Sequence, residues 1–298
     1  MDKLSRSHDG FFKKLMSDTQ RVKDYLNAYL PEHIKTIVDF TTLEQDTESY
    51  VDEKLKQSFS DVVFKIDTKT NSTINLCFLF EHKSYIDEKA PFQMLHYISA
   101  AMLKRAENNK PQRLIIPILF YHGQTSWTYK NLSQHFESLD DNLTAYLPKF
   151  EYLYHNFQNK PDNEIKDAFD KLTAASLLAM KHFYNKGYLL DNIQVFLFAS
   201  IDEKGNLYKP LAVYLFDKIP KDDKSIQIVM NNTPAPHEAE FISILDAYKI
   251  EGKNEGKNET IHQTCINMIR KGLDNKLICE VLEVDEEYVE QLRKDLQE

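Results

Sequence analysis

The sequence has little cysteine and no long hydrophobic run. Three cysteines occur among 298 residues, Cys77, Cys265 and Cys279, with neither the spacing of a metal site nor the even count of a disulfide framework. A reducing, cytoplasmic location is therefore expected. No apolar run reaches the roughly 18 residues of a membrane span, and the opening stretch MDKLSRSHDGFF lacks the apolar core of a signal peptide. We expect no association with a membrane.

An excess of positive charge is also absent. The chain carries 37 Lys and Arg against 46 Asp and Glu, a net charge of −9. This balance argues against whole-surface binding to nucleic acid or to an anionic membrane, although a local basic groove is compatible with it. Hydrophobic residues make up 42% and charged residues 28%, as in a soluble globular protein with one large domain, alone or beside a small one.

Hydrophobic patterns between residues 59 and 123 predict a mixed α/β core. Segments 59–66 and 74–83 are rich in β-branched and aromatic residues and are joined by a polar stretch, which predicts an antiparallel hairpin. An amphipathic helix is expected at 90–107, followed by a strand at 113–123 that is buried on both faces. The residues expected on the inward face of the helix are Phe92, Leu95, Ser99, Met102 and Ala106.

The segment before this core is predicted to be helical. Apolar residues recur at helical spacing over 7–30, and Pro31 marks the end of a single helix. His8 and Asp9 are expected to cap this helix, because Asp is a favoured N-cap; the alternative is that they lie at the edge of a functional site. Residues 46–58 favour a short helix or an ordered loop.

The segments after the core predict a helical second half. Residues 149–157 favour an edge strand, 162–219 are mostly helical in pattern, and 220–240 read as a polar loop. The domain assignment that follows is 1–245 for the main domain with its helical additions, 246–260 for a polar Gly/Lys/Glu linker, and 261–298 for a small helical segment.

The C-terminal segment predicts three short helices, with Gly272 capping the first and Asp285 starting the last. Its pattern suggests a helix-turn-helix. However, residues 271–298 hold four basic and nine acidic side chains, 4 − 9 = −5, which argues against contact with DNA. We favour oligomerisation, giving a homo-oligomer through this segment, or regulation of the main domain.

Two opposite charges interrupt the end of a buried strand in the stretch FEHKS, residues 80–84. Side chains two apart in a strand share a face, so Glu81 and Lys83 point the same way. The hairpin can bring Asp61 alongside them. Two carboxylates are suited to binding a divalent cation such as Mg²⁺, and a lysine beside them can hold a water or stabilise charge on a phosphate. The alternative to such a site is an ordinary ion pair at a strand end, without a role in catalysis.

A second pair lies on the helix at 90–107. Gln93 and Tyr97 stand four residues apart and therefore share one face, opposite much of the apolar stripe. Gln can hydrogen-bond a metal-bound water or a phosphate, and Tyr can do the same or stack on a base. A solvated helix face would show the same pair.

The order of elements, with Asp61, Glu81-His82-Lys83 and Gln93-x-x-x-Tyr97, resembles the PD-(D/E)XK nuclease superfamily. More narrowly, the chain is similar to the recombination-promoting nucleases, also described as putative transposases of the YhgA type. The matching stretches are HDGFFKKLMSD, YVDEKLKQSFSDVVFKI, FLFEHKS, PFQMLHY, IPILFYHG and the tract EGKNEGKNE.

This resemblance implies a restriction-endonuclease-like mixed sheet flanked by helices and a metal-dependent DNA endonuclease that acts in recombination or in conflict with mobile elements and phages. By position, Asp61, Glu81 and Lys83 are the implied catalytic residues, with Asp61 and Glu81 as ligands of Mg²⁺ or Mn²⁺. Ser60 replaces the proline of the superfamily's name. The resemblance also implies an upstream acidic ligand, and the candidates are Glu48, Asp52 and Glu53.

Two rival functions stay open at the level of the sequence. The chain could be a non-catalytic DNA-binding or protein-interaction module on a nuclease fold, although the intact Asp61, Glu81 and Lys83 argue against decay. Cleavage of RNA in place of DNA is the other, since the motif does not distinguish the two.

Overall fold

The computed structural model describes residues 3–46, 62–69, 76–136, 138–199, 207–220, 222–234, 239, 242–243 and 260–296, with the side chains of 3–7, 76–79 and 81 outside this description. The chain divides into two compact units, Met1–Ala235 and Pro236–Glu298. Most of the segment predicted at 46–58 and of the predicted linker at 246–260 lies outside the described residues.

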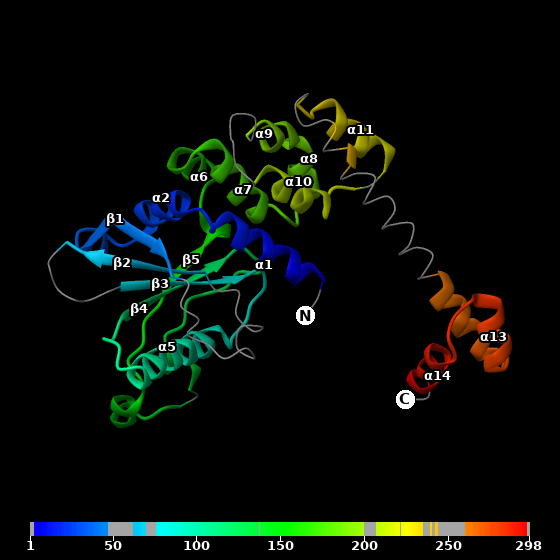
Figure 1. Ribbon diagram of the computed structural model, residues 1–298, viewed down its shortest axis with the longest axis horizontal. Coiled ribbons are helices and arrows are strands. Elements are labelled where there is room, and N and C mark those ends of the chain that lie inside the picture. Colours follow the sequence, from blue (N-terminus) through cyan, green and yellow to red (C-terminus); the bar gives the residue numbers. More distant parts are fainter. Residues whose placement is uncertain are drawn as a thin grey trace. The chain divides into compact units, whose positions relative to one another are not determined.

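A five-stranded mixed sheet, in the order β1-β2-β3-β4-β5, forms the centre of the first unit (Figure 1). The strands are β1 (Val38–Gln45), β2 (Val62–Thr68), β3 (Leu76–Lys83), β4 (Leu114–Tyr121) and β5 (Leu153–Asn156). β2 pairs antiparallel with β1 and β3, whereas β4 pairs parallel with β3 and β5. The predicted hairpin, the mixed α/β core and the edge strand are confirmed, while β1 was not predicted.

Helices cover both faces of this sheet (Figure 1). α5 (Ala90–Glu107) lies on one face, and α1 (Lys3–Leu15) and α2 (Thr19–Tyr29) lie on the other. Further described helices are α3 (Glu32–Lys35), α6 (Asp162–Ala168), α7 (Lys171–Lys181), α8 (Lys186–Asp191), α9 (Ile193–Phe198), α10 (Tyr208–Phe216) and α11 (Asp223–Asn231), with 3₁₀ turns at Leu132–His135, Asp141–Tyr146 and Phe157–Asn159.

The prediction of one helix over 7–30 is wrong, because a cap divides it. The Asp18 carboxylate accepts hydrogen bonds from the backbone N–H groups of Gln20 and Arg21 and so starts α2. His8 and Asp9 lie inside α1 and do not cap it. The loop predicted at 220–240 is also wrong in part, since Asp222 caps α11 through the backbone N–H of Ser225.

Side chains on β3 and β4 alternate between the two helical layers. On the side of α1 and α2, the Phe80 ring lies 5.5 Å from Tyr25 and the Phe120 ring 4.9 Å from Phe12, measured between ring centroids. These four aromatic side chains are at most 1% exposed. Burial of each stabilises the fold by about 1.5–3 kcal/mol, so this layer is the main core of the sheet.

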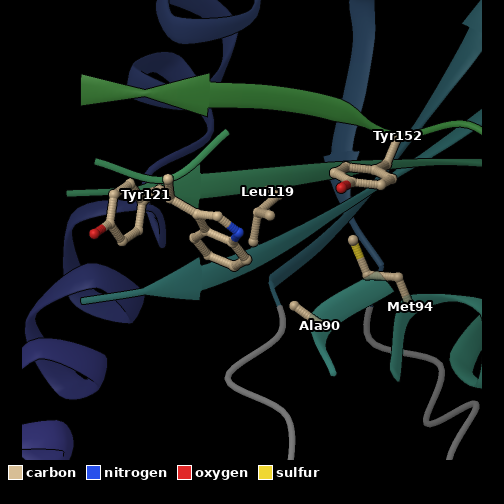
Figure 2. Close-up of a cluster of buried hydrophobic side chains, with 6 residues drawn as sticks. Ala90, Met94, Leu119, Tyr121 and Tyr152 are labelled. Carbon is tan, nitrogen blue, oxygen red and sulfur yellow. The ribbon is translucent and has the colours of Figure 1, made fainter. Parts of the chain in front are cut away.

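On the opposite face, α5 packs against β4. Ala90 and Met94 of α5 form a buried cluster with Leu119, Tyr121 and Tyr152, together with Trp127 (Figure 2). Figure 2 shows the Met94 side chain directed toward Tyr152. The buried residues of α5 are Ala90, Pro91, Met94, Tyr97, Ala101 and Arg105.

The inward face predicted for this helix is therefore wrong. Phe92 and Met102 are 42% and 38% exposed, and the buried stripe is rotated toward Tyr97. The small side chains of Ala90 and Ala101 lie on the buried stripe and so permit a close approach to the sheet. Phe92 instead packs edge-on against the His135 ring, with 5.1 Å between centroids.

The second unit contains three helical segments, as predicted: residues 260–270, α13 (Asn275–Leu282) and α14 (Glu286–Asp295). Cys265, Ile278, Val289 and Leu292 form its buried cluster. Gly272 has a φ of 77° after the first segment, and the Asp285 carboxylate caps α14, which confirms both predicted caps.

Candidate functional site

Lys83, the last residue of β3, holds its ammonium group at the start of α5. Lys83 Nζ lies 2.9 Å from Asp87 Oδ2 and donates a hydrogen bond of 3.2 Å to Gln93 Oε1. The Lys83 and Asp87 side chains are 9% and 14% exposed. A lysine this buried needs a hydrogen-bonded acid to offset the loss of hydration. The structure thus brings together Lys83 and Gln93, two residues that the sequence singled out.

Asp87 is a member of this group that the sequence analysis missed. Its carboxylate also accepts a hydrogen bond from the Lys89 backbone N–H, and its carbonyl accepts one from Ala90, at the start of α5. The turn between β3 and α5 therefore fixes the carboxylate that holds Lys83. A sequence signal existed in the spacing of Lys83 and Asp87, four residues apart, but it becomes a contact only through that turn.

The remaining predicted site residues differ in how far they are described. Tyr97 is 4% exposed and lies in the interface between α5 and the sheet, so the expectation that it lies opposite the apolar stripe is wrong. Glu81 occupies β3 in register with Leu119 of β4, but its side chain lies outside the described part. Asp61 lies outside the described residues, as do the candidate upstream acids Glu48, Asp52 and Glu53.

Asp46, which lies beside the start of β2, forms an ion pair with Arg113. Asp46 follows β1, and its backbone N–H donates to the Val63 carbonyl at 2.8 Å. Its Oδ2 lies 2.6 Å from Arg113 Nη1, and its side chain is 2% exposed. The pair joins the segment after β1 to the residue before β4, and no local sequence pattern predicts it.

A cluster of three histidines lies on the other face of the sheet. His8 of α1 and His122 after β4 are fully buried, and His82 of β3 is 6% exposed. The Nε2 atoms of His82 and His122 are 2.8 Å apart, and their rings stack at 4.9 Å. The His8 ring lies 4.9 Å from that of His122. His82 points away from Lys83, as strand alternation requires.

The hydrogen-bond partners assign the protons of this cluster. The Met180 carbonyl can only accept, so His122 Nδ1, at 2.9 Å, must donate to it. Neutral His122 then carries a lone pair on Nε2, which accepts the hydrogen bond from His82 Nε2. His82 Nδ1 is left facing Asp9, at 3.7 Å from Oδ1. His8 completes the cluster through Tyr214, whose hydroxyl lies 2.7 Å from Nδ1.

Burial favours the neutral form of His8 and of His122. It lowers the pKa of His8 to about 3, with further lowering by the charges of His82 and Lys218. It also holds the pKa of His122 well below its ordinary value, with the neighbouring His82 and His8 acting in the same direction. A neutral His122 can donate to the Met180 carbonyl through Nδ1 and accept from His82 through Nε2, which a charged ring could not do.

A glycine permits the close approach of backbone and side chains at the end of β4. A Cβ built on Gly123 would lie 2.6 Å from the Ser84 carbonyl oxygen and 2.5 Å from the Tyr121 hydroxyl. The His122 N–H also donates to the Lys83 carbonyl, at 3.2 Å. The ends of β3 and β4 are therefore held together tightly where Lys83 lies.

Within the described part of the chain, no helix is long and apolar enough to span a bilayer. The described side chains likewise include no group of three His, Cys, Asp or Glu placed to hold a metal ion.

Comparison with known proteins shows relatives along most of the chain. The inactive recombination-promoting nuclease-like protein RpnE of Escherichia coli strain K12 is 25% identical over 283 residues, which are 92% of this chain and 93% of RpnE. The recombination-promoting nuclease RpnD of E. coli O157:H7 is 32% identical over 124 residues, 41% of this chain and 47% of RpnD. RpnA of strain K12 is 32% identical over 120 residues, 40% of this chain and 41% of RpnA.

The matches to RpnD and RpnA thus span less than half of those proteins. No solved structure matches the chain. The family model described as "Putative transposase, YhgA-like" matches residues 6–206, which include the whole sheet and the Lys83–Asp87–Gln93 group. With two thirds of its length matched, the chain belongs to the YhgA-like putative transposase family; two of the relatives above are named recombination-promoting nucleases, and RpnE is named inactive.

Proposed function

We propose that this chain is a divalent-metal-dependent endonuclease of the PD-(D/E)XK type that hydrolyses phosphodiester bonds of DNA, in recombination or in conflict with mobile elements and phages. The observation that carries the proposal is the buried ammonium of Lys83, held by Asp87 and Gln93 at the end of β3. Glu81 precedes it by two residues on the same strand, so strand alternation gives the two side chains one face.

Asp61 and Glu81 are proposed as the metal ligands. Asp61 directly precedes Val62, and Glu81 directly follows Phe80; Val62 and Phe80 are register partners in the β2–β3 hairpin. Two carboxylates provide the hard oxygen ligands that Mg²⁺ and Mn²⁺ prefer. When bound, the metal would polarise the phosphate and acidify a water ligand.

Lys83 is proposed to act as a cation. With Asp87 at 2.9 Å, the charged form of the ammonium is favoured, which suits binding a phosphate oxygen and stabilising negative charge that develops during cleavage. General-base catalysis would require the neutral amine, which this carboxylate disfavours. Gln93 is proposed to orient the ammonium, since its side-chain oxygen accepts the hydrogen bond. Tyr97, one turn further on α5, is proposed to support this group from the buried interface.

A non-catalytic DNA-binding or protein-interaction module is the second candidate. The observation that favours it is the likeness to RpnE, which spans 92% of this chain and is named inactive. Against it, Asp61, Glu81 and Lys83 are all present in this sequence, and the Lys83 ammonium is held in place.

The test is incubation of the purified chain with supercoiled plasmid in Mg²⁺, in Mn²⁺ and in EDTA. We expect nicked and linear DNA with either metal and intact plasmid in EDTA. The Asp61→Ala and Glu81→Ala variants should both lose this activity. Labelled RNA of the same sequence serves as a second substrate. Plasmid that binds but stays intact with every metal would support the second candidate, and cleavage of RNA alone would reassign the substrate.

We further propose that the second unit forms a homo-oligomer through α13. Leu277 and Val281 stand four residues apart on this helix and are 40% and 58% exposed. We expect Leu277→Ser with Val281→Ser to lower the molar mass measured by light scattering. Leu296→Ser is the control, since Leu296 is 38% exposed at the end of α14. An unchanged mass in the double variant would contradict this proposal.

A further inference from the structure

We infer that His122 is a positioning residue for cleavage, and that its hydrogen bond with His82 fixes the end of β3 on which Glu81 and Lys83 lie. The inference rests on the proposed function and adds to it a residue on the face of the sheet opposite the reacting groups. His82 stands between Glu81 and Lys83 in the sequence. Any shift or twist of β3 at His82 therefore moves both neighbours on the other face.

Two hydrogen bonds join the end of β3 to the residue that follows β4. The His122 backbone N–H donates to the Lys83 carbonyl at 3.2 Å, and the His82 and His122 rings bond through their Nε2 atoms at 2.8 Å. Lys83 itself is in register with Tyr121, the residue before His122. The backbone bond sets the separation of the strands, and the side-chain bond sets the twist of β3 at His82.

His122 is in turn anchored to the helical layer. Its Nδ1–H donates to the Met180 carbonyl of α7 at 2.9 Å. Gln158 Nε2 donates to the carbonyls of both His122 and Lys181, each at 2.8 Å. Three elements far apart in sequence thus meet at His122, which gives the end of β3 a rigid reference.

A stability role alone does not account for this arrangement. Phe120 and Phe12 show that aromatic hydrocarbon packs well in the same layer. Buried imidazoles lose hydration and recover it only through directional hydrogen bonds, so apolar side chains of equal volume would stabilise the fold at least as well. What the imidazole pair adds is a fixed geometry, and misplacement of reacting groups by about 1 Å can slow a reaction by about 100-fold.

The test compares His122→Leu and His122→Gln with His155→Leu. His155 is the matched control, because it is a buried histidine of β5 bonded to Tyr25 at 2.6 Å, and β4 separates it from His82 of β3, with Phe120 as the register partner of both. We expect His122→Leu to lower kcat for plasmid cleavage by about 10- to 100-fold with little change in KM. His122→Gln should recover most of the rate, because its side chain can accept from His82. His155→Leu should retain kcat at temperatures where it is folded.

Hydrogen–deuterium exchange provides a readout that does not depend on activity. In His122→Leu, the peptide that covers residues 80–84 should exchange faster than in the wild type, while His155→Leu leaves it unchanged. Unchanged exchange there in folded His122→Leu overturns the inference, whether or not the wild type cleaves DNA. Full kcat in His122→Leu also overturns it. Loss of the proposed function would appear separately, as a wild type without metal-dependent cleavage.

Discussion

Replacement of Lys83 by methionine should lower kcat for metal-dependent DNA cleavage by about 100- to 1,000-fold, the usual loss when one preorganised hydrogen-bond donor to a developing negative charge is removed. Methionine preserves the length and much of the apolar stem of lysine, so the loss concerns the ammonium group. The rate is measured in single-turnover cleavage of a labelled duplex at saturating Mg²⁺. Substrate affinity should change much less, because the proposed role of the ammonium is to stabilise charge that develops during the cleavage step.

Two control variants make this result specific. Lys89→Met removes a positive charge six residues away, at an exposed position before α5, and should retain the wild-type rate. Lys83→Met also leaves the Asp87 carboxylate without its ammonium partner, which destabilises a buried charge. Adding Asp87→Asn should restore thermal stability without restoring activity. A Lys83→Met protein that cleaves at the wild-type rate would refute the role assigned to Lys83.

The parts of the fold that the sequence could predict depend on local patterns. β2 and β3 follow from dense β-branched and aromatic residues, and α13 and α14 from apolar spacing with Asp caps. β1 was missed because Val38–Gln45 alternates weakly and contains Asp, Thr and Glu. The predicted inward face of α5 differs from the observed one because the buried stripe includes Ala90 and Ala101, which carry little hydrophobic signal, and the polar side chain of Arg105.

The candidate site also contains residues that local motifs predict and residues that only the packed fold brings together. Lys83 and Gln93 were singled out because they belong to short motifs on adjacent elements, and the structure joins them. The histidine cluster could not be predicted from the sequence, because His8, His82 and His122 meet only when α1, β3 and β4 are packed together. Local periodicity carries no information on contacts between residues this far apart in sequence.

Acidification below about pH 6.5 should progressively destabilise this protein, because it contains buried histidines that stay neutral in the fold. Burial lowers the pKa of His8 to about 3 and that of His155 to about 4, and the pKa of His122 lies well below its ordinary value. In the unfolded chain each imidazole titrates near pH 6.5. Between about pH 6.5 and 4 the unfolded state therefore binds up to three more protons than the folded state, so the free energy of unfolding falls as the pH falls.

The slope of the free energy of unfolding against pH shows how many buried histidines take up a proton on unfolding. Each histidine contributes about 1.4 kcal/mol per pH unit, and the three together about 4 kcal/mol per pH unit, against a total stability of about 5–15 kcal/mol. Stability should be fully present above about pH 6.5 and largely lost by about pH 4. The Asp162 carboxylate loses its contribution at lower pH, because hydrogen bonds from Lys181, Tyr188 and His182 outweigh its burial and hold its pKa below the ordinary 3.8.

Urea denaturation at a series of pH values between 7 and 4 measures this dependence. His155→Gln keeps a hydrogen-bonding group beside Tyr25 but cannot take up a proton, so its slope should be smaller by about 1.4 kcal/mol per pH unit. His96→Gln, at an exposed position on α5, is the matched control and should keep the wild-type slope. If His155→Gln and the wild type lose stability in parallel, proton uptake by the buried imidazole of His155 does not drive acid unfolding. A stability independent of pH across this range would contradict the neutral state of all three.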